Sequence, residues 1–396
     1  MKIFSTIFLT VFLCCFLLCS ASCAVFASSA MWNRLHETEF AVKANSIIET
    51  SDGEYAVAGG LYSPDDFWLI KLDESGNIVW NRTFGGKQQD VAYSLVETSD
   101  GGYALAGFTE SFGDGSRDFW LVKTESNGNM QWNQTYGGPN PEEAYSLIET
   151  SDGGYALVGY VKIPDVIKHN IVAIKRGADF WVVKTDSKGN MEWNQTYGGR
   201  EYERAYSVVE ANDGGYVIAG DSWLIKLDSQ GNTEWEHNDL VGGARSLVKT
   251  SDGGYALTGG GFLTKTDSFG NIQWNQTHGG TSLVETADGG FAFLSGSGLV
   301  KNDAQGIIEW NIEYETNSHP GTEWSRLNSV IETSEGGYVI AGDIFNWFTG
   351  AGMLWVIQTD NYGVVPEFSS WLVLPVFLVC SFSVILFKKK LSTNRY

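Results

Sequence analysis

Residues 92–136 read AYSLVETSDGGYALAGFTESFGDGSRDFWLVKTESNGNMQWNQTY, and this stretch carries the pattern that determines the fold. It contains four short apolar runs separated by Ser-Asp-Gly-Gly, by a longer polar segment and by Glu-Ser-Asn-Gly. Apolar runs bounded by Asp, Asn, Ser and Gly are typical of β-strands joined by tight turns. No window between turns is long enough for a helix. We name the strands A, B, C and D in chain order.

The same unit recurs along the chain. The acidic residue of the A–B turn marks each copy: Asp52, Asp100, Asp152, Asp213, Asp252, Asp288 and Glu335. The last copy ends after its C strand at 354–360, and its Trp-Asn strand appears instead at residues 31–35. Counted with that strand, seven D strands match seven A–B–C sets, each marked by a tryptophan: Trp32, Trp80, Trp132, Trp193, Trp235, Trp274 and Trp310.

Four short antiparallel strands repeated radially form the blade of a β-propeller. The sequence therefore predicts an all-β, seven-bladed propeller of four-stranded antiparallel blades. The displaced N-terminal strand completes the last blade, so that the ring closes and no open edge remains. The expected blade repeats are 45–91, 92–143, 144–204, 205–243, 244–280, 281–326 and 327–363, with 31–38 completing the last.

The two ends of the chain predict its compartment. Residues 1–30 hold a lysine, an apolar run and a small-residue end, the layout of a secretory signal peptide. Cys23 offers lipid attachment as an alternative. All five cysteines lie in the terminal segments, which excludes a disulfide framework for residues 31–365. Residues 371–387 carry no charge and precede three lysines, which predicts a C-terminal transmembrane helix with a basic cytoplasmic tail.

The segment 366–396 combines Pro366-Glu367-Phe368, an apolar span and a basic cluster. This order resembles the C-terminal sorting signals of archaeal surface proteins, which implies processing by an archaeosortase-type enzyme. The pattern Asp-x-x-Gly-x-x-x-Trp, seen at 186–193, resembles the repeats of quinoprotein-like propellers, in which the tryptophan packs between neighbouring blades. The strand at 103–107 resembles kelch blades. These propeller resemblances imply architecture and carry no function.

Net charge restricts the partners. The formal charge of −21 argues against nucleic-acid binding, which needs a cationic surface to displace counterions. A predicted signal peptide and membrane span place the expected ectodomain, residues 31–365, at the cell surface, anchored in the plasma membrane.

Loop lengths distinguish the two faces of the propeller. The A–B and C–D turns barely vary in length, whereas the B–C and D–A connections vary widely. In an antiparallel blade the two variable connections emerge on one face, which we call the top face. Variable loops on a rigid scaffold are where binding usually occurs.

Two sets of top-face residues are candidate ligand sites. The B–C loops carry aromatic rings that either stack on glycans or pack locally over the blades: Tyr62, Phe108, Phe112, Phe345, Trp347 and Phe348. Carboxylates precede several A strands and either hold Ca²⁺, which prefers several oxygen ligands, or are solvated turn residues: Asp90, Glu142, Glu143, Glu203 and Glu323. No other metal or cofactor is expected.

An insert at 161–177 breaks the pattern in blade three. It places basic side chains among aliphatic ones, against the acidic background of the chain, and Lys168, Lys175 and Arg176 are its candidate binding residues. It is either a docking element for an acidic or lipid surface, or a long hairpin that extends strands B and C.

Asn-x-Thr sequons follow the D-strand tryptophans at Asn81, Asn133, Asn194 and Asn275, which predicts N-glycosylation of a secreted chain. The histidines show no metal-spaced pair, and most carboxylates belong to the repeat itself. We therefore expect a binding or scaffold module for glycans or surface proteins. The alternative is an extracellular carbohydrate-active propeller enzyme, which would need two facing carboxylates in the top-face mouth.

Overall fold

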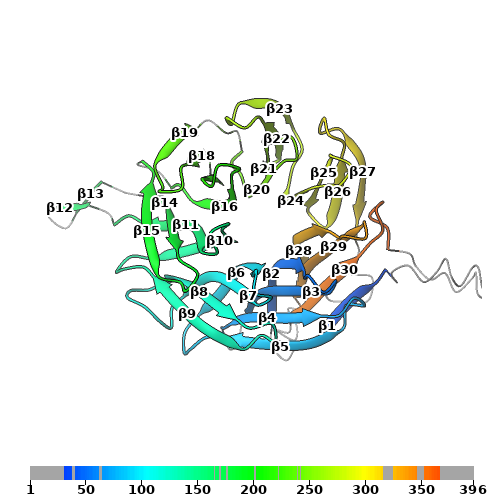
Figure 1. Cartoon of the computed structure of the whole chain (residues 1–396), viewed down its shortest axis with the longest axis horizontal. Helices are drawn as coiled ribbons and strands as arrows, with labels where there is room; N and C mark the ends of the chain where they lie inside the picture. The colour runs from blue at the N-terminus through cyan, green and yellow to red at the C-terminus, as the bar shows by residue number, and fades with distance from the viewer. Residues whose placement is uncertain are drawn as a thin grey trace, which may run out of the picture. The chain divides into compact units, whose positions relative to one another are not determined.

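The computed structural model describes residues 31–37, 41–61, 65–164, 166–168, 171–174, 177–199, 202–221, 223–238, 240, 242–314, 324–345 and 352–365. These residues form seven four-stranded sheets and one two-stranded sheet. The seven sheets are arranged in a ring around a central axis, with their first strands innermost (Figure 1). The predicted seven-bladed propeller is confirmed.

Each of the first three blades is complete within its own repeat. Blade one holds β2 (Val42–Glu49), β3 (Tyr55–Leu61), β4 (Phe67–Leu72) and β5 (Ile78–Phe84). Blade two holds β6 (Asp90–Glu97), β7 (Tyr103–Thr109), β8 (Asp118–Thr124) and β9 (Met130–Tyr136). Blade three holds β10 (Glu142–Glu149), β11 (Tyr155–Lys162), β14 (Ala178–Thr185) and β15 (Met191–Tyr197).

Blades four to six have shorter strands, and blade seven takes its outer strand from the N-terminus. Blade four holds β16 (Ala205–Glu210), β17 (Tyr216–Gly220), β18 (Leu224–Leu227) and β19 (Thr233–His237). Blade five holds β20 (Ser246–Lys249), β21 (Tyr255–Gly259), β22 (Phe262–Thr266) and β23 (Ile272–Gln276). Blade six holds β24 (Thr281–Glu285), β25 (Phe291–Ser295), β26 (Gly298–Asn302) and β27 (Ile308–Glu313). Blade seven holds β28 (Trp324–Glu332), β29 (Tyr338–Phe345), β30 (Gly352–Gln358) and β1 (Asn33–Glu37).

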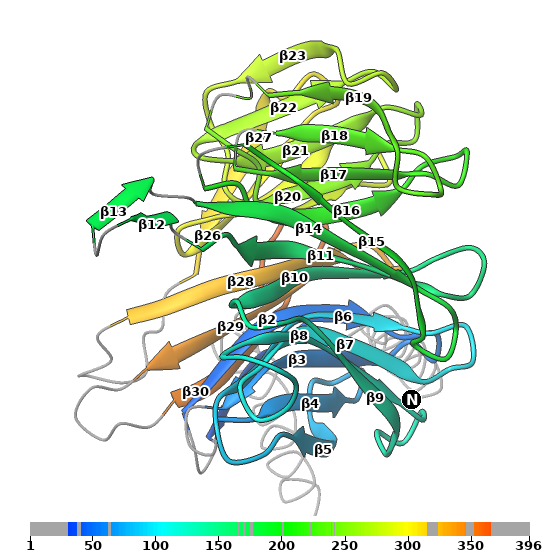
Figure 2. The ribbon, with the colours of Figure 1, turned by 90° about the vertical axis from the view of Figure 1, so that its left-hand side faces the viewer.

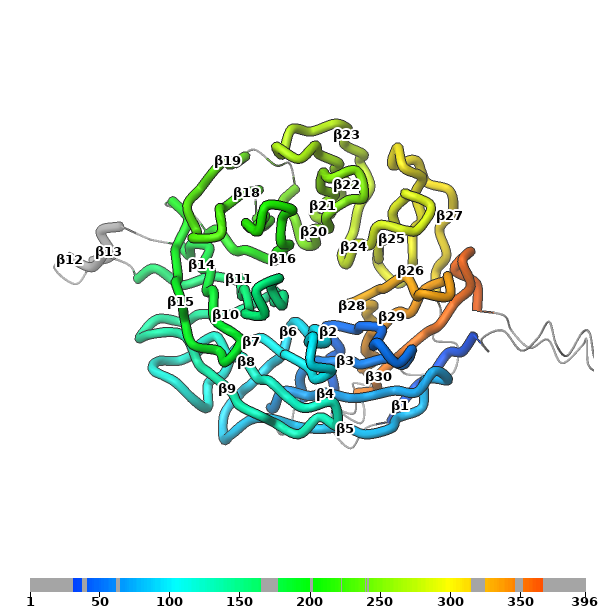
Figure 3. Tube along the Cα trace, in the orientation of Figure 1, coloured from blue at the N-terminus to red at the C-terminus, as the bar shows by residue number. Residues whose placement is uncertain are grey.

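The ring closes through β1, as the sequence predicts. β1 pairs antiparallel with β30, from Asn33 opposite Ile357 to Glu37 opposite Met353. The indole nitrogen of Trp355 donates to Asn33 Oδ1 at 2.8 Å. Figure 3 shows the dark blue β1 beside the orange β30. The last blade is therefore joined from both ends of the described chain.

Apolar side chains fill the spaces between neighbouring blades. Every residue of β7 and β8 is buried, because each of these middle strands is covered on both faces by adjacent sheets. Phe119 of blade two lies against Trp181 of blade three with ring centres 4.5 Å apart. The outer strand β9 is instead exposed or partly buried except at its last residue. The hydrophobic core is thus divided into one layer per blade interface.

The D-strand tryptophans pack against the next blade, as the resemblance to quinoprotein-like propellers implies. Trp132 lies 5.9 Å from Tyr155, centre to centre, and covers the turn glycine Gly189. A Cβ at Gly189 would lie 2.6 Å from the indole, and its φ of +77° also favours glycine. The same contact recurs at Trp32–Gly76, Trp80–Gly128, Trp193–Gly231, Trp235–Gly270, Trp274–Gly306 and Trp310–Gly363.

Buried lysines support the turns on the face opposite the top face. Lys123 in β8 is 3% exposed, and its ammonium lies 2.9 Å from Asp100 of the A–B turn. The pairing recurs at Lys71–Asp52, Lys184–Asp152, Lys226–Asp213, Lys265–Asp252 and Lys301–Asp288. A buried ammonium needs such a partner, because desolvation without one is costly. In blade seven, Gln358 and Glu335 occupy the corresponding positions.

The insert of blade three forms a sheet of its own. β12 (Val166–Lys168) pairs with β13 (Ile171–Ile174), apart from the blade sheet of order β10-β11-β14-β15. The hairpin is therefore separate from the four-stranded blade rather than a simple lengthening of its strands. In Figure 2 it stands on the side of the ring opposite the turn that joins β14 to β15. Lys168 lies in β12, whereas Lys175 and Arg176 lie outside the described residues.

The chain divides into two units, residues 1–364 and 365–396. The predicted signal peptide, the sorting residues Pro366, Glu367 and Phe368, and the span 371–387 lie outside the described residues. Within the part of the chain that the structure describes, no helix is long and apolar enough to cross a membrane.

Candidate functional site: the mouth of the central channel

The A strands carry one variable residue per blade near the centre of the ring, where the first strands lie innermost (Figure 1). A β-bulge after the alanine near the start of most of these strands leaves an extra residue unpaired, as between Ala92 and Ser94. A bulge redirects its side chain, and bulges are frequent at functional sites. At this place in the repeat stand Asn45, Tyr93, Tyr145, Tyr206, Arg245, Thr281 and Asn328. In blade six the unpaired residue is Ser282 rather than Thr281, and β20 of blade five has no bulge.

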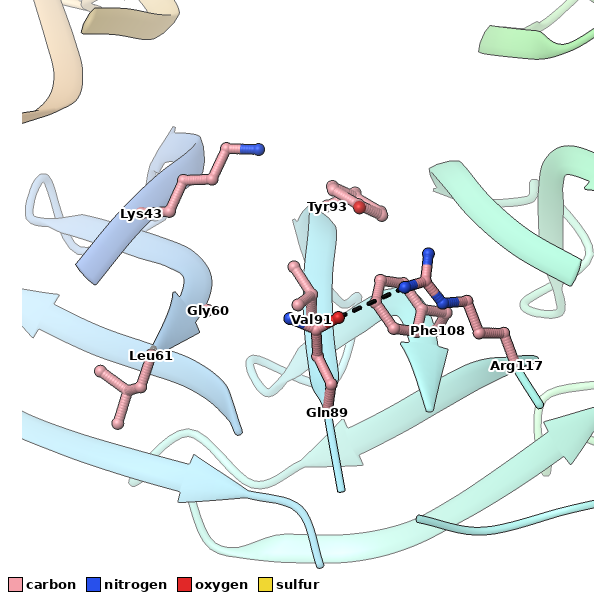
Figure 4. Close-up of a pocket in the computed structure, with 8 residues that line it drawn as sticks. All are labelled: Lys43, Gly60, Leu61, Gln89, Val91, Tyr93, Phe108 and Arg117. Carbon is pink, nitrogen blue, oxygen red and sulfur yellow. Dashed lines mark hydrogen bonds between the residues drawn. The ribbon is translucent and has the colours of Figure 1, made fainter. Parts of the chain in front are cut away.

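A pocket of about 140 Å³ opens at the top face between blades one and two. Figure 4 shows Lys43 on one side of it, Tyr93 in the middle, and Arg117 over Phe108 on the other side. The guanidinium carbon of Arg117 lies 4.3 Å from the Phe108 ring centre, which is a cation–π contact. The pocket is lined by Lys43, Gly60, Leu61, Gln89, Val91, Tyr93, Phe108 and Arg117.

Arg117 is fixed in place by carboxylates and an amide. Its Nε donates to Glu110 Oε1 at 2.8 Å, and its Nη1 donates to Glu143. Its Nη2 donates to Gln89 Oε1 at 3.4 Å, the dashed line in Figure 4. Although desolvation opposes the charge, the two carboxylates outweigh it and raise the pKa of Arg117. The pocket therefore has a permanently charged and rigidly held wall.

Glu143 joins this wall to blade three. It is 5% exposed and accepts hydrogen bonds from the Tyr145 and Tyr160 hydroxyls, both at 3.0 Å. Burial, followed by the negative charge of Glu143, raises the pKa of both tyrosines, so both phenols stay neutral. The Glu143 carboxylate is therefore fully engaged in contacts with Arg117, Tyr145 and Tyr160.

Lys43 shares the mouth with a buried carboxylate of blade seven. Burial lowers the pKa of Lys43, and the negative charge of Asp343 opposes that shift. Burial raises the pKa of Asp343 to about 6, while Asn328 donates to its Oδ1 at 2.6 Å. The mouth thus joins residues from the first and last blades.

The predicted aromatic residues are placed differently from one another. Phe108 is 2% exposed and lies beneath Arg117, so its ring packs locally while forming part of the pocket. Phe112 is 44% exposed, with its ring centre 5.4 Å from that of Trp120. Phe345 is partly buried at the end of β29. Tyr62, Trp347 and Phe348 lie outside the described residues.

The predicted calcium ligands are distributed between blades. Asp90 is fully buried and accepts from Thr109, Ser111 and the Gly86 amide. Glu142 is buried beside Asp118, and Glu143 is bound to Arg117. Glu203 is partly buried, and Glu323 lies outside the described residues.

Within the described ranges, no group of three or more His, Cys, Asp or Glu side chains is arranged to hold a metal ion. Asp90, Glu142 and Glu143 are buried, so they are not the solvated turn residues that the sequence offered as the alternative. Calcium binding by these residues stays a prediction.

Asp118 and Glu142 are the acidic pair with the most perturbed protonation. Both are 2% exposed. Burial, reinforced by neighbouring negative charge, raises the pKa of Asp118 to about 6 and that of Glu142 to about 7. Paired carboxyl groups with raised pKa values resemble an acid–base pair, but this pair is enclosed and a substrate would not reach it.

The sequons lie on the outer strands. Asn81, Asn133, Asn194 and Asn275 are all exposed, on β5, β9, β15 and β23. Asn133 Oδ1 accepts from the Trp120 indole at 3.1 Å, and Asn194 Oδ1 accepts from Trp181 at 3.2 Å. Their exposure is compatible with the predicted modification.

Sequence reasoning missed the tyrosines and cations of the inner wall. Tyr93, Tyr145 and Tyr206 read as ordinary strand residues, because a β-strand pattern does not show which side chain a bulge redirects. One signal was available. This column holds tyrosine in three successive blades and Arg245 in the next, whereas neighbouring columns of the repeat are nearly uniform.

Comparison with solved structures identifies the class of protein. The WD40 β-propeller domain of Doa1 superposes with a TM-score of 0.53 and 11% identity, covering 82% of this chain and 96% of that one. Sqt1 from Chaetomium thermophilum gives 0.50 and 14%, covering 78% and 84%. No protein-family model and no curated protein matches the chain. The chain is a seven-bladed β-propeller, distantly similar to WD40 propellers.

Proposed function

We propose that the chain is a cell-surface binding module whose ligands are glycans or surface proteins and whose site is the channel mouth on the top face. The observation that carries this proposal is the pocket between blades one and two. Its walls come from Lys43, Tyr93 and Arg117, in loops and strand starts where the blades differ. Propellers supply a rigid frame for such loops.

The contrast between the faces supports the top face as the binding face. The opposite face repeats one lysine–aspartate pairing in six blades, as expected of a structural element. At the mouth, equivalent positions hold asparagine, tyrosine, arginine or threonine. A ligand site needs a specific constellation, and this constellation occurs where the internal repeat is broken.

The cellular setting of the proposal rests on the chain ends. The signal-peptide pattern of residues 1–30 and the apolar segment 371–387 support secretion and membrane anchorage. Pro366-Glu367-Phe368 supports an archaeal origin and processing by an archaeosortase-type enzyme. Protease added to intact cells should then digest the propeller. Full protection until the cells are lysed would contradict this topology.

A binding screen against glycans and surface proteins tests the function itself. The full-length chain should capture a ligand, and Tyr93→Ala should weaken capture at least roughly fivefold, because the pocket loses a wall. Phe269→Ala is the matched control, since Phe269 is 67% exposed in a C–D turn of the opposite face. Equal weakening by both variants, or by neither, would contradict a top-face site.

The basic insert of blade three is a second candidate contact surface within the same function. Its β12–β13 hairpin lies outside the blade sheet, so the propeller does not need it for strand pairing. Replacing residues 163–177 by a short Gly-Ser turn should leave the fold intact and reduce binding to anionic surface material. Unchanged binding by the folded variant would make the insert a structural hairpin only.

A further inference from the structure

The inner wall of the mouth carries a continuous stack of cations and tyrosines across five blades. Lys43 Nζ lies 5.6 Å from the ring centre of Tyr93. Tyr93 and Tyr145 have ring centres 5.2 Å apart, and Tyr145 and Tyr206 also 5.2 Å apart. The guanidinium carbon of Arg245 lies 4.0 Å from the centre of Tyr206. Each residue comes from a different blade, and a cation closes each end.

The two cations of this stack and the neighbouring Arg204 form no salt bridge with any residue that the structure describes. Among the described residues, no salt bridge within 4.0 Å joins a carboxylate to Lys43, Arg204 or Arg245. Arg204 instead lies over Tyr160 at 5.6 Å, and its buried Nε has no hydrogen-bond partner. The strand-C lysines of the opposite face, in contrast, are each paired at 2.8–2.9 Å.

In a chain of net charge −21, carboxylates are abundant, yet Asp343 and Asp221 act on Lys43 and Arg204 only from beyond salt-bridge distance. Their charge is therefore available to an anionic ligand at the mouth. Acidity elsewhere on the surface would restrict such a ligand to this place, because the surrounding field repels anions.

The backbone of the inner strands argues against a peptide ligand. A peptide adds to a sheet edge through unpaired N–H and C=O groups. Here the edge amides already donate to serines of the neighbouring blade, as from Leu147 N to Ser94 Oγ at 3.1 Å. The same contact recurs from Ile47, Leu247, Leu283 and Val330 to Ser329, Ser207, Ser246 and Ser282.

The stacked rings also disfavour a neutral sugar. A neutral sugar binds an aromatic side chain through an open ring face. Here Lys43 lies over Tyr93 and Arg245 over Tyr206, and Tyr206 stacks on Tyr145 with an angle of 25° between the rings, while Tyr93 is tilted by 59° against Tyr145. What the mouth offers is positive charge, tyrosine hydroxyls and the Gln89 amide.

We propose that the channel mouth binds an acidic polysaccharide whose sugar units bear carboxylates. This inference rests on the proposed function and specifies its ligand. The carboxylates pair with Lys43, Arg204 and Arg245, which supply charge-assisted hydrogen bonds. The pocket of about 140 Å³ beside Arg117 accepts one side of the chain of sugars.

Calorimetric titration of the full-length chain with polygalacturonate tests the proposal. Binding should be measurable, and it should weaken with added salt, because it depends on charge. Fully methyl-esterified polygalacturonate has the same sugar backbone without the charge, and it should bind at least roughly tenfold more weakly. Equal binding of the two polymers would overturn the proposal. Poly-glutamate that binds as tightly as polygalacturonate would show a general polyanion site and would overturn the carbohydrate class.

Three single-charge variants locate the site. Lys43→Gln and Arg245→Gln should each raise the dissociation constant roughly fivefold, and the double variant should raise it further. Lys188→Gln is the matched control, since Lys188 is exposed in a C–D turn of the opposite face. Thermal melts of all variants confirm that they fold. Unchanged affinity of folded Lys43→Gln and Arg245→Gln would overturn the proposal.

The two proposals fail differently. If polygalacturonate does not bind but a neutral glycan or a surface protein binds in a Tyr93-dependent way, the ligand class is wrong and the binding function stands. If Lys188→Gln weakens binding as much as the mouth variants do, the site lies elsewhere and both proposals are overturned.

Discussion

One glycine in each C–D turn meets two requirements at the same time. Gly189 needs a left-handed backbone, and it also needs to leave room for Trp132 of the preceding blade. Gly153 in the A–B turn meets only the first requirement, since no atom lies within 4 Å of a Cβ added there. The repeat therefore contains an internal pair that separates backbone strain from packing.

Gly189→Ala should destabilise the protein more than Gly153→Ala does. Both residues have a positive φ, +77° and +80°, and alanine in that region costs about 1–2 kcal/mol. Gly189→Ala adds a clash with the Trp132 indole, worth about 1–3 kcal/mol more. Urea denaturation of both variants gives the difference in the free energy of unfolding. Equal losses of unfolding free energy in the two variants would show that the Trp132 side chain moves aside without destabilising the protein.

In each lysine–aspartate pair the lysine is buried and the aspartate is exposed, so loss of the two partners should have different effects on stability. Asp100→Ala should destabilise by about 1–3 kcal/mol, because Lys123 stays buried with only the Thr124 carbonyl as an acceptor, at 2.8 Å. Lys123→Met should cost less, because the Asp100 side chain is 54% exposed and stays hydrated. Thermal denaturation of the two variants gives the order. A costlier Lys123→Met would contradict it.

Protonation of enclosed carboxyl groups should make the protein more stable at mildly acidic pH. Asp118, Glu142 and Asp343 have folded-state pKa values raised to about 6, about 7 and about 6. Their unfolded values are about 4, so the folded chain binds more protons between about pH 4 and pH 7. The melting temperature should therefore rise as the pH falls from about 8 to about 5. In Glu142→Gln this rise should be smaller.

The turn aspartates reverse this trend in stronger acid. Although desolvation opposes the shift, hydrogen bonds and buried lysines lower the pKa of Asp100, Asp152, Asp252 and Asp288 to about 2. Their stabilisation is complete above about pH 4 and is lost as the pH falls towards about 2. Scanning calorimetry across the pH range checks both limbs. A melting temperature that falls steadily from about pH 8 to about pH 5 would contradict the first limb.

Among the strands, β1 is the element on which closure depends. Its pairing with β30 is supported by Trp32, which is 5% exposed and donates from its indole to the Glu74 carbonyl at 2.8 Å. β1 therefore fills the last position in blade seven and also contacts blade one.

Deleting residues 31–38 should lower the melting temperature and promote aggregation, because β30 becomes an exposed edge. Trp32→Ala keeps the backbone pairing and removes only the wedge, at a cost of about 3–5 kcal/mol. Static light scattering should then show aggregation of the deletion variant but not of Trp32→Ala. A deletion variant that melts like the intact chain would contradict closure through β1.

At the scale of the molecule, the sequence predicts what the repeat dictates. The seven blades and the displaced N-terminal strand follow from patterns that recur, and the structure confirms them. The strand bounds shift by two residues, since β1 is 33–37 rather than 31–35 and β30 is 352–358 rather than 354–360. The Lys123–Asp100 pairing could also have been predicted from the sequence, because a lysine in an otherwise apolar strand needs a partner for its charge.

The candidate site was less predictable, for a physical reason. The Arg117–Glu143 contact joins a loop of blade two to a strand of blade three, and the tyrosine stack depends on how neighbouring blades are rotated. Neither contact can be predicted from the alternation of residues within a single strand. The ligand role of the top-face loops stays a prediction, and Phe108, for which local packing was the alternative, lies under the Arg117 guanidinium while lining the pocket.

The pairing of β1 with β30 also determines when the ring can close during synthesis of the chain. Asn33 and Trp355, which share a hydrogen bond, are 322 residues apart, so the first strand to be synthesised has to wait for the last. Contacts this distant in the chain form slowly, because the entropy of closing a long loop is lost before the contacts stabilise the fold. Six blades can pair their own strands as they emerge, but the ring stays open, with two unsatisfied edges, until residues 352–358 exist. The time during which unpaired strand edges are exposed to aggregation is therefore set by the length of the chain rather than by the folding rate of any blade.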